Sequence, residues 1–90
     1  MDFEWHEPKR LANIRLHHLD FADADLLFGG LHLIAPARTV EGEQRWLATG
    51  TLDDVYVTAV FTRRGEVIRL ISMRRARDGE REAHQQVFGY

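Results

Sequence analysis

The chain has 90 residues, of which 44% are hydrophobic and 29% are charged. This length predicts one small domain over residues 1–90 and excludes a two-domain enzyme. The composition is typical of a folded globular protein rather than a disordered one. Because the chain has no cysteine, disulfides, thiolate metal sites and a cysteine nucleophile are excluded.

The formal net charge is -2 at pH 7, which argues against a protein that coats nucleic acid through its overall charge. Arginine is concentrated locally, however. Eleven of the twelve basic residues are arginines, and seven of these lie between Arg63 and Arg81. A guanidinium group binds phosphate or carboxylate through two parallel hydrogen bonds. A local basic surface for an acidic partner therefore remains open on this acidic chain.

The start of the chain carries Asp2 and Glu4, where a signal peptide would need positive charge. The longest apolar stretches span only a few residues, which is too short for a membrane-spanning helix. These features predict a cytoplasmic protein.

The first part of the sequence predicts an edge strand at residues 3–5 followed by two helices. The first helix has Pro8 in its first turn and runs to about His18, with apolar positions at Leu11 and Ile14. Asp20 is placed to cap the second helix, which ends at Gly29-Gly30. Its apolar positions are Phe21, Ala24, Leu27 and Phe28.

Strands follow, beginning with residues 31–35, which we expect to end at Pro36 and to lead into a polar loop over residues 37–43. Three further strand-like runs are separated by compact turns at Asp53-Asp54 and Arg64-Gly65. After these strands, a last helix is predicted from about Gly79 to Gln86.

Two-residue turns would define the register of these three strands. On one face they pair Leu52 with Val55, Gly50 with Val57, Ala48 with Ala59 and Trp46 with Phe61, and they place Ile68, Leu70 and Ser72 beside Phe61, Ala59 and Val57. This face is apolar, and we expect the two N-terminal helices to cover it. Gly50, Ala48 and Ala59 would leave room for Phe21, Leu27 or Phe28.

The opposite face is mixed and carries Arg45, Val60, Arg69, Ile71 and Met73. In this register Arg69 lies opposite Val60, and Arg45 lies opposite Thr62 on the other side of the same strand. The two arginines would then lie near each other across the sheet. Such a face can bind an anion.

A metal site is not favoured, because His17 and His18 are adjacent rather than four residues apart on a helix. Arg69 within a strand is costly unless it meets an anion or a carboxylate such as Glu80, and both interpretations stay open. His17 is a candidate general base near neutral pH. It can equally be a histidine that complements the dipole at the end of its helix.

Several motifs together resemble the BrnT family of toxins. They are Phe3-Glu4-Trp5-His6-Glu7-Pro8-Lys9-Arg10, Asn13, His17, Phe21-Ala22-Asp23-Ala24, Arg45-Trp46, Tyr56-Val57, Phe61-Thr62, Arg69-Leu70-Ile71-Ser72-Met73-Arg74-Arg75-Ala76 and Glu80-Arg81. The resemblance implies an α+β domain with a RelE-like fold, in which two N-terminal helices pack on one face of an antiparallel sheet and a C-terminal helix follows.

The resemblance also implies a type II toxin that cuts mRNA without a metal ion or other cofactor. A neighbouring BrnA-like antitoxin would neutralise it, and the complex would bind operator DNA through the antitoxin. A toxin dimer within a heterotetramer is the implied assembly. A partner segment is expected to bury Tyr56, Val60, Ile71 and Met73 while its acidic side chains meet the arginines.

The resemblance implies a set of site residues. The candidates for catalysis are Lys9, His17, Arg64, Arg69, Arg74, Arg75 and Glu80, and those for RNA binding are Arg45, Arg63 and Arg81. Within this set, Arg69 with Arg74 or Arg75 would stabilise charge on the phosphate, and His17 or Lys9 would move protons. No metal ligand is implied.

The chain departs from the family pattern at His6, at Leu16-His17-His18 and at His84. His6 or His84 would be a new group for proton transfer, or a neutral change. Three functions are therefore compared: a ribonuclease toxin, a weakened toxin that binds the antitoxin as co-repressor, and an inhibitor of another target such as a topoisomerase. Cleaved transcripts distinguish the first of these from the other two.

Overall fold

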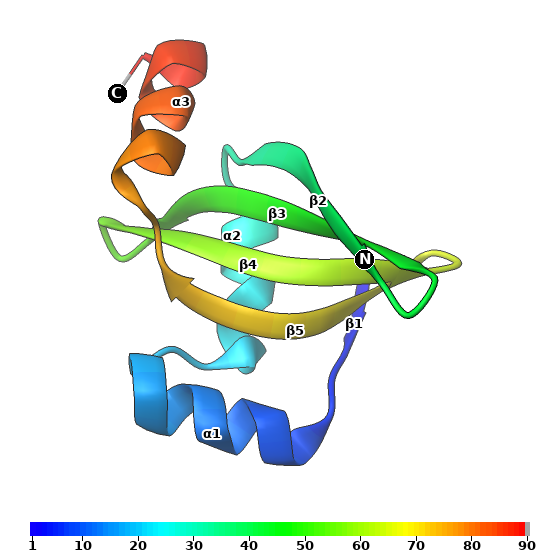
Figure 1. Ribbon diagram of the computed structural model, residues 1–90. Coiled ribbons are helices and arrows are strands. Elements are labelled where there is room, and N and C mark those ends of the chain that lie inside the picture. Colours follow the sequence, from blue (N-terminus) through cyan, green and yellow to red (C-terminus); the bar gives the residue numbers. More distant parts are fainter. Residues whose placement is uncertain (90) are drawn as a thin grey trace.

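The computed structural model describes residues 1–89, which form a five-stranded sheet with three α-helices and one 3-10 helix (Figure 1). The elements are β1 (Asp2–Glu4), α1 (Glu7–His17), η1 (Phe21–Asp23), α2 (Ala24–Gly29), β2 (Leu33–Val40), β3 (Glu43–Leu52), β4 (Val55–Arg64), β5 (Val67–Arg75) and α3 (Asp78–Phe88). The predicted α+β class is confirmed. No helix in this part of the chain is long and apolar enough to cross a membrane.

The strand order is β1-β5-β4-β3-β2. Neighbouring strands are antiparallel except for β1 and β5, which are parallel. The expectation of an entirely antiparallel sheet is therefore wrong at this edge. Most of the chain lies between β1 and β5, and such a long connection permits parallel pairing.

The β3–β4 hairpin has the predicted register, with Leu52 opposite Val55 and Trp46 opposite Phe61. Asp53 and Asp54 both have positive φ, at 49° and 66°, as a two-residue type I′ turn requires. The alternation of apolar and polar residues on these strands therefore places the predicted apolar set on one face.

The predicted β4–β5 register is wrong by two residues near the turn and by three beyond the bulge. The turn consists of residues 65 and 66, so Phe61 lies opposite Leu70 rather than Ile68. An irregularity then places Ser72 opposite Val60 and Met73 opposite Ala59. Because Ile71 is the extra residue in this bulge, Met73 turns into the core instead of the outer face.

The prediction that Pro36 ends a strand is also wrong. β2 continues to Val40, with Pro36 opposite Trp46 and a bulge between Pro36 and Thr39. β2 is an edge strand, where the missing N–H of proline removes no bond of the sheet interior. The expected loop over residues 37–43 shrinks to a turn at residues 41 and 42.

The core lies between the apolar face of the sheet and the N-terminal helices. In Figure 1, α2 passes behind the sheet and α1 lies along its lower side next to β5. The largest fully buried apolar side chains are Phe21, Phe61, Leu27, Leu70 and Met73. A Cβ atom at Gly50 would lie 2.9 Å from Cδ1 of Leu27, so the predicted space for this leucine is confirmed.

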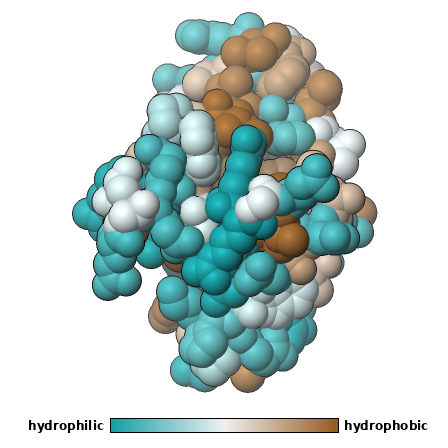
Figure 2. All heavy atoms as spheres, turned by 90° about the vertical axis from the view of Figure 1, so that its right-hand side faces the viewer, coloured by the Kyte–Doolittle hydropathy of each residue, from teal (hydrophilic) through white to brown (hydrophobic). Residues whose placement is uncertain are grey.

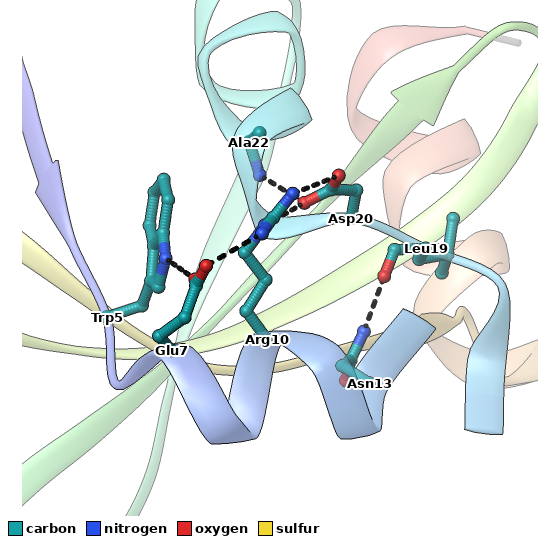
Figure 3. Close-up of polar contacts among 7 residues, drawn as sticks. All are labelled: Trp5, Glu7, Arg10, Asn13, Leu19, Asp20 and Ala22. Carbon is teal, nitrogen blue, oxygen red and sulfur yellow. Dashed lines mark hydrogen bonds and ion pairs between the residues drawn. The ribbon is translucent and has the colours of Figure 1, made fainter. Parts of the chain in front are cut away.

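The start of α1 is held by polar contacts (Figure 3). Trp5 donates a hydrogen bond to Glu7, and Arg10 bridges Glu7 and Asp20. Asp20 also accepts from the N–H of Ala22, which confirms it as the predicted cap. The hydrogen bonds from Arg10 and from the Ala22 N–H hold the pKa of Asp20 below its usual value.

The predicted apolar stripe of α1 is largely wrong, because Asn13 is the buried residue of this helix and Leu11 is 51% exposed. Hydrogen bonds and ion pairs, rather than an apolar face, therefore contribute much of the attachment of α1 to the rest of the fold.

Candidate functional site: an arginine groove and a hairpin pocket

The sheet face opposite the core carries several of the predicted arginines. Phe61, Leu70 and Met73 are buried on the core face and Trp46 is partly buried there. Along the strands they alternate with the arginines of the outer face, which are Arg45, Arg64, Arg69 and Arg74. We call these four residues the arginine face. The prediction of one dry face and one arginine-bearing face is confirmed.

One end of the outer face is covered by α3 through a polar network. Thr49 and Thr58 are buried, and their hydroxyl oxygens lie 2.8 Å apart. Thr58 donates to Glu80 at 3.0 Å. Arg74 donates to both carboxylate oxygens of Glu80, at 2.8 and 2.9 Å.

This network fixes the charge on Glu80. The hydrogen bonds from Arg74, helped by those from the Arg77 N–H and Thr58, lower the pKa of Glu80 to about 2. The same pairing raises the pKa of Arg74. Glu80 is therefore ionised near neutral pH and is a poor proton donor. It holds Arg74 and the first turn of α3 in place.

Beyond α3, the outer face contains a hollow of about 430 Å³, which we call the arginine groove. Leu47, Val60 and Ile71 form its floor. Arg38, Arg45, Arg74 and Arg77 line it. Among residues 1–89, no ion pair engages Arg38, Arg45 or Arg77. The groove therefore combines an apolar floor with three cations open to an acidic ligand.

Sequence reasoning missed Arg38 and Arg77 as site residues. Arg38 falls in the loop expected over residues 37–43, and Arg77 lies just before the last predicted helix. The bulge between Pro36 and Thr39 interrupts the alternation of β2, so no local pattern in the sequence assigns Arg38 to the groove.

Besides Arg74, two further arginines of the arginine face have carboxylate partners within the chain. Arg69 pairs with Glu4 at 2.5 Å, and Arg64 pairs with Glu43 at 3.2 Å. The expected partner Glu80 for Arg69 is wrong, because Glu4 is opposite Arg69 in the β1–β5 pairing. Thr62, not Val60, lies opposite Arg69. The end of the sheet that contains the β4–β5 turn is mainly hydrophilic (Figure 2).

Arg63 and Lys9 lie away from the arginine face. The guanidinium of Arg63 stacks over Trp46 at 5.4 Å and over Phe61 at 5.9 Å, so it stands at the rim of the core face. Lys9 is exposed in the first turn of α1. It precedes His17 by eight residues of one helix, a rise of about 12 Å. Lys9 and His17 therefore lie near opposite ends of α1.

A second hollow, of about 620 Å³, lies between the end of α1, the β3–β4 turn and the end of β5. We call it the hairpin pocket. Its lining consists of Leu16, His17, His18, Leu19, Asp23, Leu52, Asp53, Val55, Arg74 and Arg75. His17, Arg74 and Arg75 of the predicted set meet here, and Arg74 lines both the pocket and the groove.

The two histidines share this pocket because α1 ends between them. His18 takes the left-handed conformation, with φ 58°, and its N–H bonds to the Ile14 carbonyl oxygen at 2.9 Å. Neighbouring side chains on a continuous helix point in different directions. Because the chain leaves the helix at His18, this does not keep His17 and His18 out of one pocket. Within residues 1–89, no group of three or more histidine and acidic side chains is arranged to hold a metal ion.

The remaining candidates flank this pocket or lie inside the fold. Arg81 pairs with Asp78 at 3.3 Å and shares a smaller hollow with Arg75. His84, considered above for proton transfer, is fully buried, and its Nε2 lies 3.0 Å from the Leu31 carbonyl oxygen. It therefore does not face either hollow.

An α+β domain with an arginine-lined sheet face and a pocket that joins histidine to arginine belongs to the class of small proteins equipped to bind phosphate-rich or acidic ligands. Comparison with family models identifies it further. The family described as ribonuclease toxin, BrnT, of type II toxin-antitoxin system matches residues 5–80, and the chain belongs to this family. A comparison with curated proteins found no match.

Proposed function

We propose that the chain cuts mRNA internally without a metal ion, and that it binds the RNA strand in the arginine groove and the reacting phosphate in the hairpin pocket. The observation that carries this proposal is the meeting of His17, His18 and Arg75 in one hollow. Arg74 lines both hollows and so connects the strand-binding groove to the reaction site.

Cleavage by the RNA's own 2′-hydroxyl needs a proton acceptor, a proton donor and positive charge on the phosphate. His17 takes the proton from the 2′-hydroxyl as its oxygen attacks phosphorus. Arg75 stabilises the negative charge on the non-bridging oxygens. The bond to the 5′-oxygen breaks, and His18 supplies the proton to that oxygen. The products are a 2′,3′-cyclic phosphate and a 5′-hydroxyl.

Histidine suits both proton steps, because an imidazole can accept or donate a proton near neutral pH. The remaining arginines have supporting roles. Arg38, Arg45 and Arg77 bind backbone phosphates along the groove, while the Glu80 pair holds Arg74 at the junction. Arg64 and Arg69 support the outer face through Glu43 and Glu4.

The antitoxin is proposed to be a BrnA-like protein that covers the arginine groove. Leu47, Val60 and Ile71 offer an apolar floor for a partner segment, and acidic residues of that segment would meet Arg38 and Arg45. Met73, expected at this contact, is buried in the core and takes no part. A toxin dimer in a cytoplasmic heterotetramer, with DNA contacted through the antitoxin, completes the proposal.

A second candidate function is a co-repressor that binds the antitoxin but does not cut RNA. It is favoured by the internal carboxylate partners of Arg64, Arg69 and Arg74, which neutralise three of the predicted catalytic arginines. Such a protein would keep the groove for its partner and would lack activity on RNA.

The test is to induce the full chain in bacterial cells with and without the neighbouring open reading frame, and to score growth and RNA 5′ ends together. We expect growth arrest and new RNA ends, both relieved by the neighbour and by Arg75→Gln. Arg15→Gln, on the exposed surface of α1, is the matched control. Normal growth with intact RNA, from folded protein that binds the neighbour's product, would establish the co-repressor instead.

A further inference from the structure

We infer that the hairpin pocket selects the nucleotide at the cut by its base, with the carboxylates of Asp23 and Asp53 favouring guanine and disfavouring uracil. This inference rests on the proposed ribonuclease function. Asp23 and Asp53 line the hairpin pocket but take no part in the proposed proton transfers.

The size and lining of the pocket fit a whole nucleotide rather than a phosphate alone. Its volume is about 620 Å³, within the range of roughly 300–1,000 Å³ that is usual for small-molecule sites. Leu19, Leu52 and Val55 provide apolar wall, against which the face of a base can pack. His17 and Arg75 provide the polar groups for its phosphate.

The two hollows differ in their acidic residues. Asp23 and Asp53 line the pocket, whereas the arginine groove has no carboxylate in its lining. Among residues 1–89, neither of these two aspartates forms an ion pair, in contrast to Asp20 and Asp78. A carboxylate in an RNA-binding pocket repels the phosphate backbone. This repulsion is offset when the carboxylate accepts hydrogen bonds from a base.

The backbone positions of both aspartates are well defined. Asp53 occupies the type I′ turn of the β3–β4 hairpin, directly after the Leu52–Val55 pair. Asp23 ends η1, and its N–H bonds to the Asp20 carbonyl oxygen at 3.0 Å. Both aspartates thus lie in turns that border the hairpin pocket.

Base chemistry then predicts the order of preference. Ionised aspartate only accepts hydrogen bonds. Guanine presents two adjacent N–H donors on its Watson–Crick edge, and one carboxylate can accept both. Adenine and cytosine each present one amino group, while uracil places two carbonyl oxygens beside its single N–H. One good bidentate contact changes discrimination by about tenfold to a hundredfold.

The test uses purified full-length chain and four RNA oligonucleotides that differ only in the nucleotide at the mapped cut. We expect the guanine substrate to be cut at least tenfold faster than the uracil substrate. The double variant Asp23→Asn, Asp53→Asn should cut the two within about threefold of each other. Asp25→Asn, an exposed aspartate on α2, is the control and should keep the preference.

Binding of 5′-GMP and 5′-UMP, measured by calorimetry, provides a readout that needs no cleavage. Tighter binding of GMP that disappears in the double variant supports the inference even if the folded chain cuts no RNA, a result that would refute the proposed function alone. Equal cutting of all four substrates, a preference that survives in the double variant, or equal binding of the two nucleotides by a chain that does not cut RNA would overturn the inference.

Discussion

The side chain of Asn13 forms two hydrogen bonds with the main chain of Met73, donating to its carbonyl oxygen at 2.9 Å and accepting from its N–H at 3.1 Å. β1 pairs only with residues 67–69 of β5, so the edge of β5 at Met73 has no strand neighbour. Asn13 supplies the missing bonds and also donates to Leu19 at 2.9 Å. It therefore attaches α1 to the sheet and fixes the chain that leads to the hairpin pocket.

Asn13→Ala should lower the free energy of unfolding by about 2–4 kcal/mol, because it leaves several buried main-chain groups without partners. Urea denaturation measures this loss. Arg15→Ala, at an exposed position of the same helix, should change stability by less than about 0.5 kcal/mol. Equal stability of the two variants would show that Asn13 does not hold α1.

Gly50→Ala should destabilise the fold by about 1–3 kcal/mol, because the new Cβ would lie 2.9 Å from Leu27 and 3.1 Å from the Leu31 carbonyl oxygen. Gly79→Ala is the matched control, since nothing lies within 4 Å of a Cβ at that position in α3. It should leave stability unchanged or raise it by up to about 1 kcal/mol. Thermal unfolding of the two variants compares them, and a stable Gly50→Ala variant would contradict the close packing.

Glu80 should make stability depend on acid pH. Its pKa falls from 4.5 to about 2 on folding, so its contribution is full above about pH 4.5 and is lost as the pH falls toward 2. The shift corresponds to roughly 3 kcal/mol. Glu80→Gln should therefore be less stable than the parent chain at pH 7 and should approach it near pH 2.

Denaturation curves from pH 7 to pH 2 check this difference. Asp20, whose pKa is also lowered, is present in both chains, so subtracting one curve from the other isolates Glu80. A difference that stays constant with pH would show that the Arg74–Glu80 pair does not couple protonation to folding.

The arginine groove should determine how strongly RNA binding depends on salt. Arg45→Gln is expected to weaken binding to all sequences alike and to reduce the slope of log K against log salt by about 0.7, the value for one phosphate contact on a single strand. Fluorescence anisotropy at several salt concentrations measures the slope. Arg15→Gln should leave it unchanged, and an unchanged slope for Arg45→Gln would exclude Arg45 from phosphate binding.

Local patterns predicted the β3–β4 hairpin well, because a two-residue turn and strict alternation determine its register. The β4–β5 register depends on the bulge at Ile71, which brings Met73 to the core and to Asn13. The contacts of Met73 with the core and with Asn13 both join residues far apart in the sequence, so local patterns do not predict them. Pro36 was misread because the rule against proline within strands applies to sheet interiors and not to edges.

The candidate site was predictable in part for the same reason. Alternation alone assigns Arg45 and Arg69 to the outer face, whereas Arg74 reaches that face only because the bulge at Ile71 reverses the alternation after Leu70. The partner of Arg69 was missed because Glu4 lies 65 residues away in the sequence. The hairpin pocket was missed because four separate segments form it, and their proximity follows only from the packing of α1 and η1 on the sheet.

The central claim is metal-free cleavage in the hairpin pocket, and the most direct measurement is the chemistry of the RNA ends produced by the purified chain in excess EDTA. We predict 5′-hydroxyl and 2′,3′-cyclic phosphate ends, formed at least about a hundredfold more slowly by His17→Asn and at the parental rate by Arg15→Gln. Cleavage that requires Mg²⁺ and leaves 5′-phosphates, or a His17→Asn variant that cuts at the parental rate, would contradict the account.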